Sequence, residues 1–156
     1  MNQTKPHGWR AAATGACLAL GLLASGAATA APVTVSGELT AGDPTFYRPN
    51  ASGPCTVSGN LTHYDTYTIV HGGGPLVIDM RGEDSDSGTL EDPYLHLYSG
   101  SFNPAQPCQN WVAGNDDYAD EESVDSHLSL TLPAGTYVIV ATSYEGIEQG
   151  EGEEGG

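Results

Sequence analysis

Apolar and polar residues alternate in several short stretches of this chain. The alternation is clearest in residues 76–80, 94–98 and 128–132. A period of two places successive side chains on opposite faces of an extended strand. Residues 136–142 form a strongly β-prone run that is apolar on both faces, which is typical of a central strand. The pattern therefore predicts strands in all four stretches.

Further β-prone stretches, with turns between them, complete the predicted fold. Residues 64–70 are rich in β-branched and aromatic side chains, and the Gly-rich segment 71–75 would turn this strand into a hairpin with residues 76–80. Shorter β-prone pieces lie nearer the N-terminus, at residues 33–35, 38–40 and 45–47. No stretch after residue 30 has a convincing helical period. We therefore predict an all-β protein, an antiparallel β-sandwich of about eight or nine short strands.

The N-terminus has the pattern of a secretory signal peptide. Lys5 and Arg10 supply the basic part, residues 11–24 supply a short apolar core, and Ala30 ends a small-residue cleavage site. The apolar core is too short for a confident membrane anchor, and no other stretch approaches the length of a span. We predict cleavage near Ala30 and a secreted protein, either extracellular or periplasmic, with no membrane span in the mature chain.

The predicted signal divides the chain into three parts. Residues 1–30 are the signal peptide, residues 31–144 form one β-sandwich domain, and residues 145–156 are an acidic, flexible tail rich in Gly and Glu. Of the 156 residues, removal of 30 leaves 126, which is enough for one domain with a single core.

The mature chain is strongly acidic. All 20 acidic residues follow Ala30, and Arg48 and Arg81 are the only two bases there, so the formal charge is −18. A surface of this sign repels nucleic acids and anionic lipids. The charge has two interpretations, a solubilising surface and a binder of multivalent cations.

Two cysteines, Cys55 and Cys108, remain after the signal. In an oxidising compartment we expect them to form a disulfide bond. The alternative, a reactive thiol, has no histidine in the adjacent sequence to support it.

Oxygen-bearing side chains stand at the ends of two predicted strands. Asp92 precedes residues 94–98, and Asn115, Asp116 and Asp117 follow the short apolar run that starts at Trp111. Calcium accepts six to eight oxygen ligands in irregular loops, so these residues are candidate calcium ligands. We expect either Asp125 or the acidic loop around Asp120 to complete the shell. The alternative is that these side chains only form Asx turns.

Tyr94, His96 and Tyr98 would form an aromatic row on one face of their strand. An exposed row could stack on carbohydrate or cover a polymer, and this gives a candidate ligand-binding face. The alternative is that the row packs beneath a loop or the opposing sheet.

Motifs of common enzymes are missing from the sequence. It contains no G-x-S-x-G elbow, no H-E-x-x-H zinc motif and no histidine pair at metal-binding spacing. We expect no catalysis.

Four pieces of the sequence resemble the bacterial pre-peptidase C-terminal (PPC) domain family. They are YDTYTI at 64–69, DPYLHLY at 92–98, NDD at 115–117 and LPAGTY at 132–137. The resemblance implies a jelly-roll-like β-sandwich that is attached to secreted hydrolases or repeated in surface proteins. Some members of the family bind calcium, and some bind polymers such as collagen. The usual final strand of the family is missing from this sequence.

These patterns together predict a secreted, non-catalytic module that binds calcium and attaches, targets or stabilises extracellular proteins. One alternative is a carbohydrate- or polymer-binding module that uses the aromatic row. Another is an assembly subunit completed by a strand from a neighbouring chain, or else a truncated gene product.

Overall fold

The computed structural model describes residues 32–82, 92–118 and 124–147. The chain divides into two units, Met1–Thr34 and Val35–Gly156. The predicted signal peptide and most of the predicted tail, from residue 148 onward, lie outside the described residues. In the first unit, residues 32–34 are described and have no regular secondary structure. The fold described below is that of the second unit.

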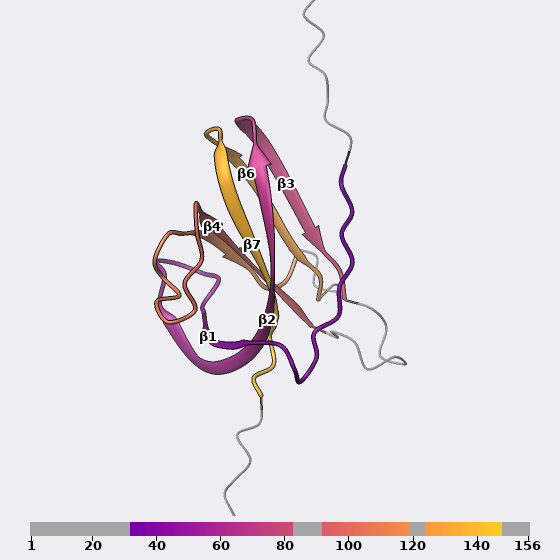
Figure 1. Ribbon diagram of the computed structural model, residues 1–156, viewed down its shortest axis with the longest axis vertical. Helices are drawn as coiled ribbons and strands as arrows, with labels where there is room; N and C mark the ends of the chain where they lie inside the picture. The colour runs from indigo at the N-terminus through magenta and orange to yellow at the C-terminus, as the bar shows by residue number, and fades with distance from the viewer. Residues whose placement is uncertain (1–31, 83–91, 119–123, 148–156) are drawn as a thin grey trace, which may run out of the picture. The chain divides into compact units, whose positions relative to one another are not determined.

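The described residues contain seven strands and no helix. The strands are β1 (Thr45–Pro49), β2 (Val57–His71), β3 (Gly74–Met80), β4 (Pro93–Ser99), β5 (Trp111–Asn115), β6 (Ser126–Leu132) and β7 (Gly135–Ser143). Five form one antiparallel sheet in the order β1-β2-β7-β4-β5, and β3 and β6 form a second antiparallel pair (Figure 1). The prediction of an all-β antiparallel sandwich is confirmed. The described part has fewer strands than predicted because residues 33–35 and 38–40 are not strands.

β2 is about twice as long as predicted, and its two halves pair with different strands. Its first half, from Val57 to His63, pairs with β1, and its second half, from Tyr64 to His71, pairs with β7. Figure 1 shows the strong curve of β2 between the two halves. This curve allows Phe46 of β1 to pack with Val138 and Val140 of β7.

The predicted hairpin between residues 64–70 and 76–80 is wrong. β2 pairs with β1 and β7, whereas β3 pairs with β6. Gly73, which has a φ of 92°, carries the chain from one sheet to the other. A glycine-rich turn signals a change of direction, but the packing of the apolar faces decides which strand becomes the partner.

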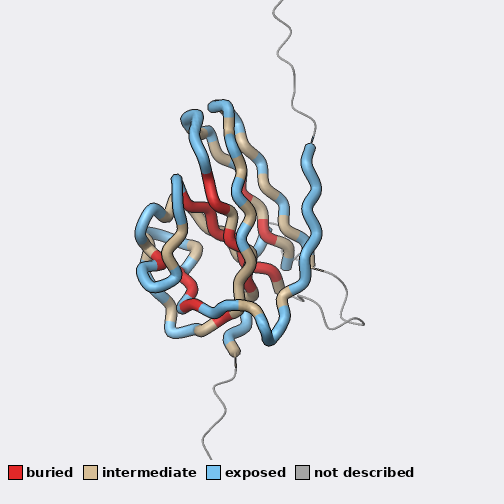
Figure 2. The backbone as a smooth tube through the Cα atoms, in the orientation of Figure 1, coloured by how far each residue is buried: buried red, intermediate tan, exposed pale blue. Residues whose placement is uncertain are grey.

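β7 is a central strand, as predicted, and it lies between β2 and β4. Apolar clusters cover both faces of this part of the sheet, and the buried residues therefore run through its middle (Figure 2). Val138 and Val140 of β7 pack with Phe46 and Tyr98 on one face. Tyr137 of β7 packs on the other face, in the cluster that joins β4 to the β3–β6 pair. This two-sided burial explains why β7 is apolar at nearly every position.

A disulfide joins Cys55, in the loop between β1 and β2, to Cys108, in the loop between β4 and β5. The predicted pairing is confirmed. Cross-links that close loops of this length restrict the unfolded chain by about 4 kcal/mol in the chain-entropy description. The bond ties the β4–β5 loop to the β1–β2 loop.

Candidate metal centre

Three aspartates meet at one end of the β4–β5 pair. Asp92 directly precedes β4, and Asp116 and Asp117 directly follow β5. The two strands are antiparallel neighbours in which Leu95 is opposite Asn115. The start of one antiparallel strand lies beside the end of the other, so the three side chains come from the same end of the sheet.

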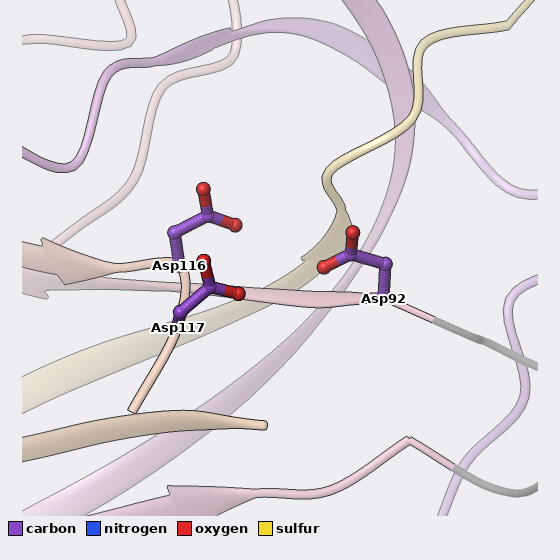
Figure 3. A group of neighbouring side chains, drawn as sticks. All are labelled: Asp92, Asp116 and Asp117. Carbon is purple, nitrogen blue, oxygen red and sulfur yellow. The ribbon is translucent and has the colours of Figure 1, made fainter. Parts of the chain in front are cut away.

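These residues form a compact acidic cluster, which we call the three-aspartate group. One carboxylate oxygen from each of Asp92, Asp116 and Asp117 lies within 4.8 Å of the other two. Figure 3 shows the carboxylates turned toward a shared space, with Asp92 facing the other two. Asp92 and Asp116 are half-buried and Asp117 is exposed. Among the described residues, no other cluster of three His, Cys, Asp or Glu residues meets the same distance limit.

Two oxygen atoms of the group are buried without a partner. Asp92 Oδ1 and Asp116 Oδ1 are enclosed and make no hydrogen bond to any described residue. A buried polar atom that lacks a partner costs about 1–3 kcal/mol, and more when it is charged. The arrangement is therefore unfavourable unless something else supplies a positive charge or a donor.

The pKa values of the group also indicate that its charge is not fully compensated. Burial, followed by the charges of Asp117 and Asp92, raises the pKa of Asp116 to about 6. Burial, followed by the charges of Asp117 and Glu145, also raises the pKa of Asp92. Crowded carboxylates favour the protonated form unless a nearby cation offsets the repulsion.

Arg48 supplies one positive charge next to the group. Its side chain is only 3% exposed, and its charge opposes the rise in the pKa of both Asp92 and Asp116. The guanidinium lies over the ring of Tyr94, at 4.1 Å, and within 5.1 Å of the ring of Tyr144. Its Nη2 donates to the carbonyl oxygen of Tyr144 at 2.8 Å. A single guanidinium faces three carboxylates, so it offsets only part of their charge.

The β5 exit and the β6 entrance are joined by hydrogen bonds. Ser126 Oγ lies 2.7 Å from the Pro93 carbonyl oxygen and 2.8 Å from that of Asp116. The amide of Tyr118 donates to the Asp125 carbonyl oxygen at 2.6 Å. These contacts hold the backbone that carries Asp116 and Asp117, which preorganises the three-aspartate group.

The other two predicted ligands have different surroundings. Asn115 Oδ1 accepts a hydrogen bond from the amide of His127 at 2.7 Å, so this oxygen is used by the β6 backbone. Asp125 is not in the three-aspartate group. Its Oδ1 accepts from the amide of Gly82 at 3.0 Å. Asp125 also lines a neighbouring cavity of about 290 Å³, the His127 cavity, whose walls are Asp79, Arg81, Tyr118, Asp125, Ser126 and His127. Asp120 lies outside the described residues.

The aromatic row of Tyr94, His96 and Tyr98 is buried, with exposed fractions of 3%, 0% and 0%. The idea of an exposed binding face is therefore wrong, and the alternative of packing beneath other elements describes the structure. Tyr98 donates to the Pro107 carbonyl oxygen at 2.8 Å. Trp111 Nε1 donates to His96 Nδ1 at 3.1 Å, and burial, together with the charge of Arg48, lowers the pKa of His96 to about 3. His96 is thus a neutral core residue.

The sequence patterns did not point to Arg48, Tyr144 or Glu145 as neighbours of the group. One usable signal was present, because Arg48 is one of only two bases after residue 30 and stands between β-prone residues and a proline. An isolated base in a strand of so acidic a chain is a candidate buried counter-ion.

Comparisons with protein-family models, with curated proteins and with solved structures found no match for this chain. In the described residues, no helix is both long enough and apolar enough to cross a membrane.

Proposed function

We propose that this protein is a secreted, non-catalytic β-sandwich module that binds calcium at Asp92, Asp116 and Asp117. The observation that carries the proposal is the convergence of three carboxylates, two of which have a buried oxygen without a partner. A cation between the carboxylates would satisfy both oxygens and remove the repulsion that raises the pKa of Asp116.

The donor set favours calcium among the common cations. The group consists of carboxylates, without imidazole or thiolate, and hard cations prefer such oxygens. Calcium–oxygen distances of roughly 2.3–2.6 Å place two ligand oxygens at most about 5 Å apart. The oxygens of the group lie within 4.8 Å of one another, so one ion could contact all three. Waters and backbone carbonyls would supply the remaining ligands.

The role we propose is the attachment, targeting or stabilisation of extracellular proteins, as in the PPC family that the sequence resembles. Three of the four resembling pieces fall mainly on β2, β4 and β7, which are the three inner strands of the larger sheet. The Cys55–Cys108 disulfide supports an oxidising compartment, in agreement with the predicted signal peptide.

The test is thermal and urea unfolding of the EDTA-treated protein with and without calcium. At a calcium concentration 100 times the dissociation constant, binding to the folded state adds about 2.7 kcal/mol to the free energy of unfolding. Asp116→Asn should lose this gain. Glu38→Gln removes the same charge at an exposed position outside the group and should keep it. If calcium leaves the unmutated protein unchanged, the proposal is wrong.

A second candidate function is that of a subunit completed by a strand from another chain, and one observation favours it. Within the described residues, β3 pairs with β6 alone. The inward-facing side chains of β3, Leu76, Ile78 and Met80, are only half-buried. A strand added beside β3 would extend the two-stranded sheet and cover them further. Native mass spectrometry should then show an assembly, and a stable monomer at all concentrations would contradict this candidate.

A further inference from the structure

The chain before β1 contains a segment that has the sequence of a strand but pairs with none. Residues 33–39 read VTVSGEL, so that Val, Gly or Leu stands at every odd position and a polar residue at every even one. A period of two is typical of a strand with one buried face. In the structure this segment is not a strand, and Val33 and Val35 are exposed. Its first two apolar side chains therefore lack a covering surface.

The segment is anchored only where it joins β1. The carbonyl oxygen of Pro44 accepts from the amide of Tyr64 in β2 at 3.0 Å, and Asp43 Oδ2 accepts from the amide of Thr40 at 2.6 Å to form a turn. Among the described residues, the backbone of residues 35–39 makes no hydrogen bond. At most about 3.3–3.6 Å is spanned by each residue of an extended chain, so residues 32–39 can reach roughly 28 Å beyond this turn.

Within its own chain the segment contacts β2. Gly37 lies so close to the hydroxyl group of Tyr67 that a Cβ at this position would clash with it. Residues 35–39 nevertheless form no ladder with β3 or with any other strand of the described part. The strand-like pattern of the segment thus has no use within the single chain.

The small sheet has one open edge, on β3. In the described residues, β3 pairs with β6 alone. The edge of β6 is partly occupied, because the amide of His127 donates to Asn115 Oδ1 at 2.7 Å. Pro75, near the start of β3, has no N–H, and proline within a sheet is typical of an edge strand. Residues 76–80 therefore remain to pair with an added strand.

The distribution of charge favours this edge as a contact between two copies. The chain after residue 30 has 20 acidic residues and two bases, so most of its surface repels a second copy. Residues 74–80 and residues 33–39 contain one acid each, Asp79 and Glu38. Two copies can bring these stretches together with little repulsion.

We propose that residues 33–39 of one chain add as a strand to β3 of a second copy, and that the two copies exchange these segments. This inference rests on the second candidate function above, that of a subunit completed by a strand, and it names the strand and its source. Backbone hydrogen bonds to residues 76–80 would supply binding, and Val33 and Val35 would cover the half-buried side chains of β3. Exchange of identical segments is a low-cost route to a closed dimer.

Native mass spectrometry of the protein over a range of concentrations tests this with two matched variants. Val35→Asp places a charge on the apolar face of the segment, where the dimer would bury it, and should raise the dissociation constant at least about tenfold. Ser36→Asp adds the same charge on the polar face and should change the constant less than about twofold. Both residues are exposed in the single chain, so neither change should disturb the sandwich. Equal dissociation constants for the two variants would overturn the inference.

Hydrogen exchange shows which edge receives the segment. The amides of residues 33–39 and 76–80 should become protected together as the concentration passes the dissociation constant. Protection of both in a monomer would mean that the segment pairs with its own β3, and would overturn the inference. A dimer that Val35→Asp leaves intact would do the same while the second candidate function stands. An unprotected monomer at all concentrations would contradict both.

Discussion

Two acidic regions lie at neighbouring strand ends, one where β3 ends and β6 begins and the other where β4 begins and β5 ends. They differ in how their oxygen atoms are satisfied. In the His127 cavity, Asp79 Oδ1 lies 2.6 Å from His127 Nδ1, and Asp125 Oδ1 accepts from the amide of Gly82. In the three-aspartate group, Asp92 Oδ1 and Asp116 Oδ1 have no hydrogen-bond partner among the described residues. Both regions contain more than one carboxylate. A candidate cation site is therefore distinguished by carboxylate oxygens that lack a hydrogen-bond partner, and not by the number of carboxylates.

Each region also has one of the two arginines that follow the predicted signal. Arg48 is buried beside the three-aspartate group, and Arg81 is exposed at the wall of the His127 cavity. The same residue type thus has two roles. Arg48 compensates buried charge within the fold, and Arg81 contributes to the surface.

Replacement of the two arginines should give the largest contrast. Arg48→Met leaves Asp92 and Asp116 without their nearby cation and leaves the Tyr144 carbonyl oxygen without its donor. We expect the free energy of unfolding in EDTA to fall by about 3 kcal/mol. Arg81→Met should change it by less than about 0.5 kcal/mol. Urea denaturation measures both, and equal effects would remove the distinction between the regions.

Neutralisation of one carboxyl in each region should give effects of opposite sign. Asp116→Asn removes a crowded charge, so the cation-free protein at neutral pH should become more stable. Because the carboxyl is only half-buried and solvent screens its charge, we expect a gain of about 1 kcal/mol. Asp125→Asn weakens the hydrogen bond from Gly82 and should lower stability by about 0.5 kcal/mol. A loss of stability in both variants would contradict the account.

The raised pKa of Asp116 also predicts a pH dependence. Its pKa is about 6 in the folded protein and 3.8 as a reference value, so the folded state binds this proton more tightly. Between these pH values the folded state holds more protons than the unfolded state, and stability falls as the pH rises. In EDTA, the ionisation of Asp116 should therefore lower the melting temperature as the pH rises from about 4 to about 6. Asp116→Asn should remove this contribution, and identical profiles for the two proteins would count against it.

The smallest effect is expected at the contact between Asp79 and His127 in the His127 cavity, which is an ion pair only when His127 is protonated. Asp79 is more than half exposed and His127 is about one-quarter exposed. Exposed pairs contribute about 0–1 kcal/mol and are screened by salt. Asp79→Asn should thus change stability by less than about 0.5 kcal/mol, and high salt should reduce the difference further. A loss of several kcal/mol would show that this region is not merely surface.

The strands whose sequence alternates were predictable, because their faces are sorted by burial. β4, β6 and β7 follow the predicted ranges closely. The first half of β2 was missed because residues 57–60 are mostly exposed and include Ser58, Gly59 and Asn60, so burial left little pattern there. Alternation also showed that Tyr94, His96 and Tyr98 share a face. It could not show that β1 and the β4–β5 loop cover that face.

The three-aspartate group was predictable in part for a similar reason. Asp92, Asp116 and Asp117 stand at strand ends that an antiparallel pairing brings together. Arg48 and Tyr144 are 96 residues apart, and no local pattern links them. Asn115 and Asp125 have the right chemistry for ligands, but backbone amides in the folded chain occupy their side-chain oxygens. Such competition depends on the tertiary structure.

The most direct test of the central claim is the calcium content of the protein at equilibrium. The EDTA-treated protein would be dialysed against buffered calcium, and the bound metal would be measured by mass spectrometry of the elements. The account predicts about one calcium per chain in the unmutated protein and in Asp125→Asn, and none when Asp116 and Asp117 are both changed to Asn. An unmutated protein that holds no more calcium than the surrounding buffer would contradict it.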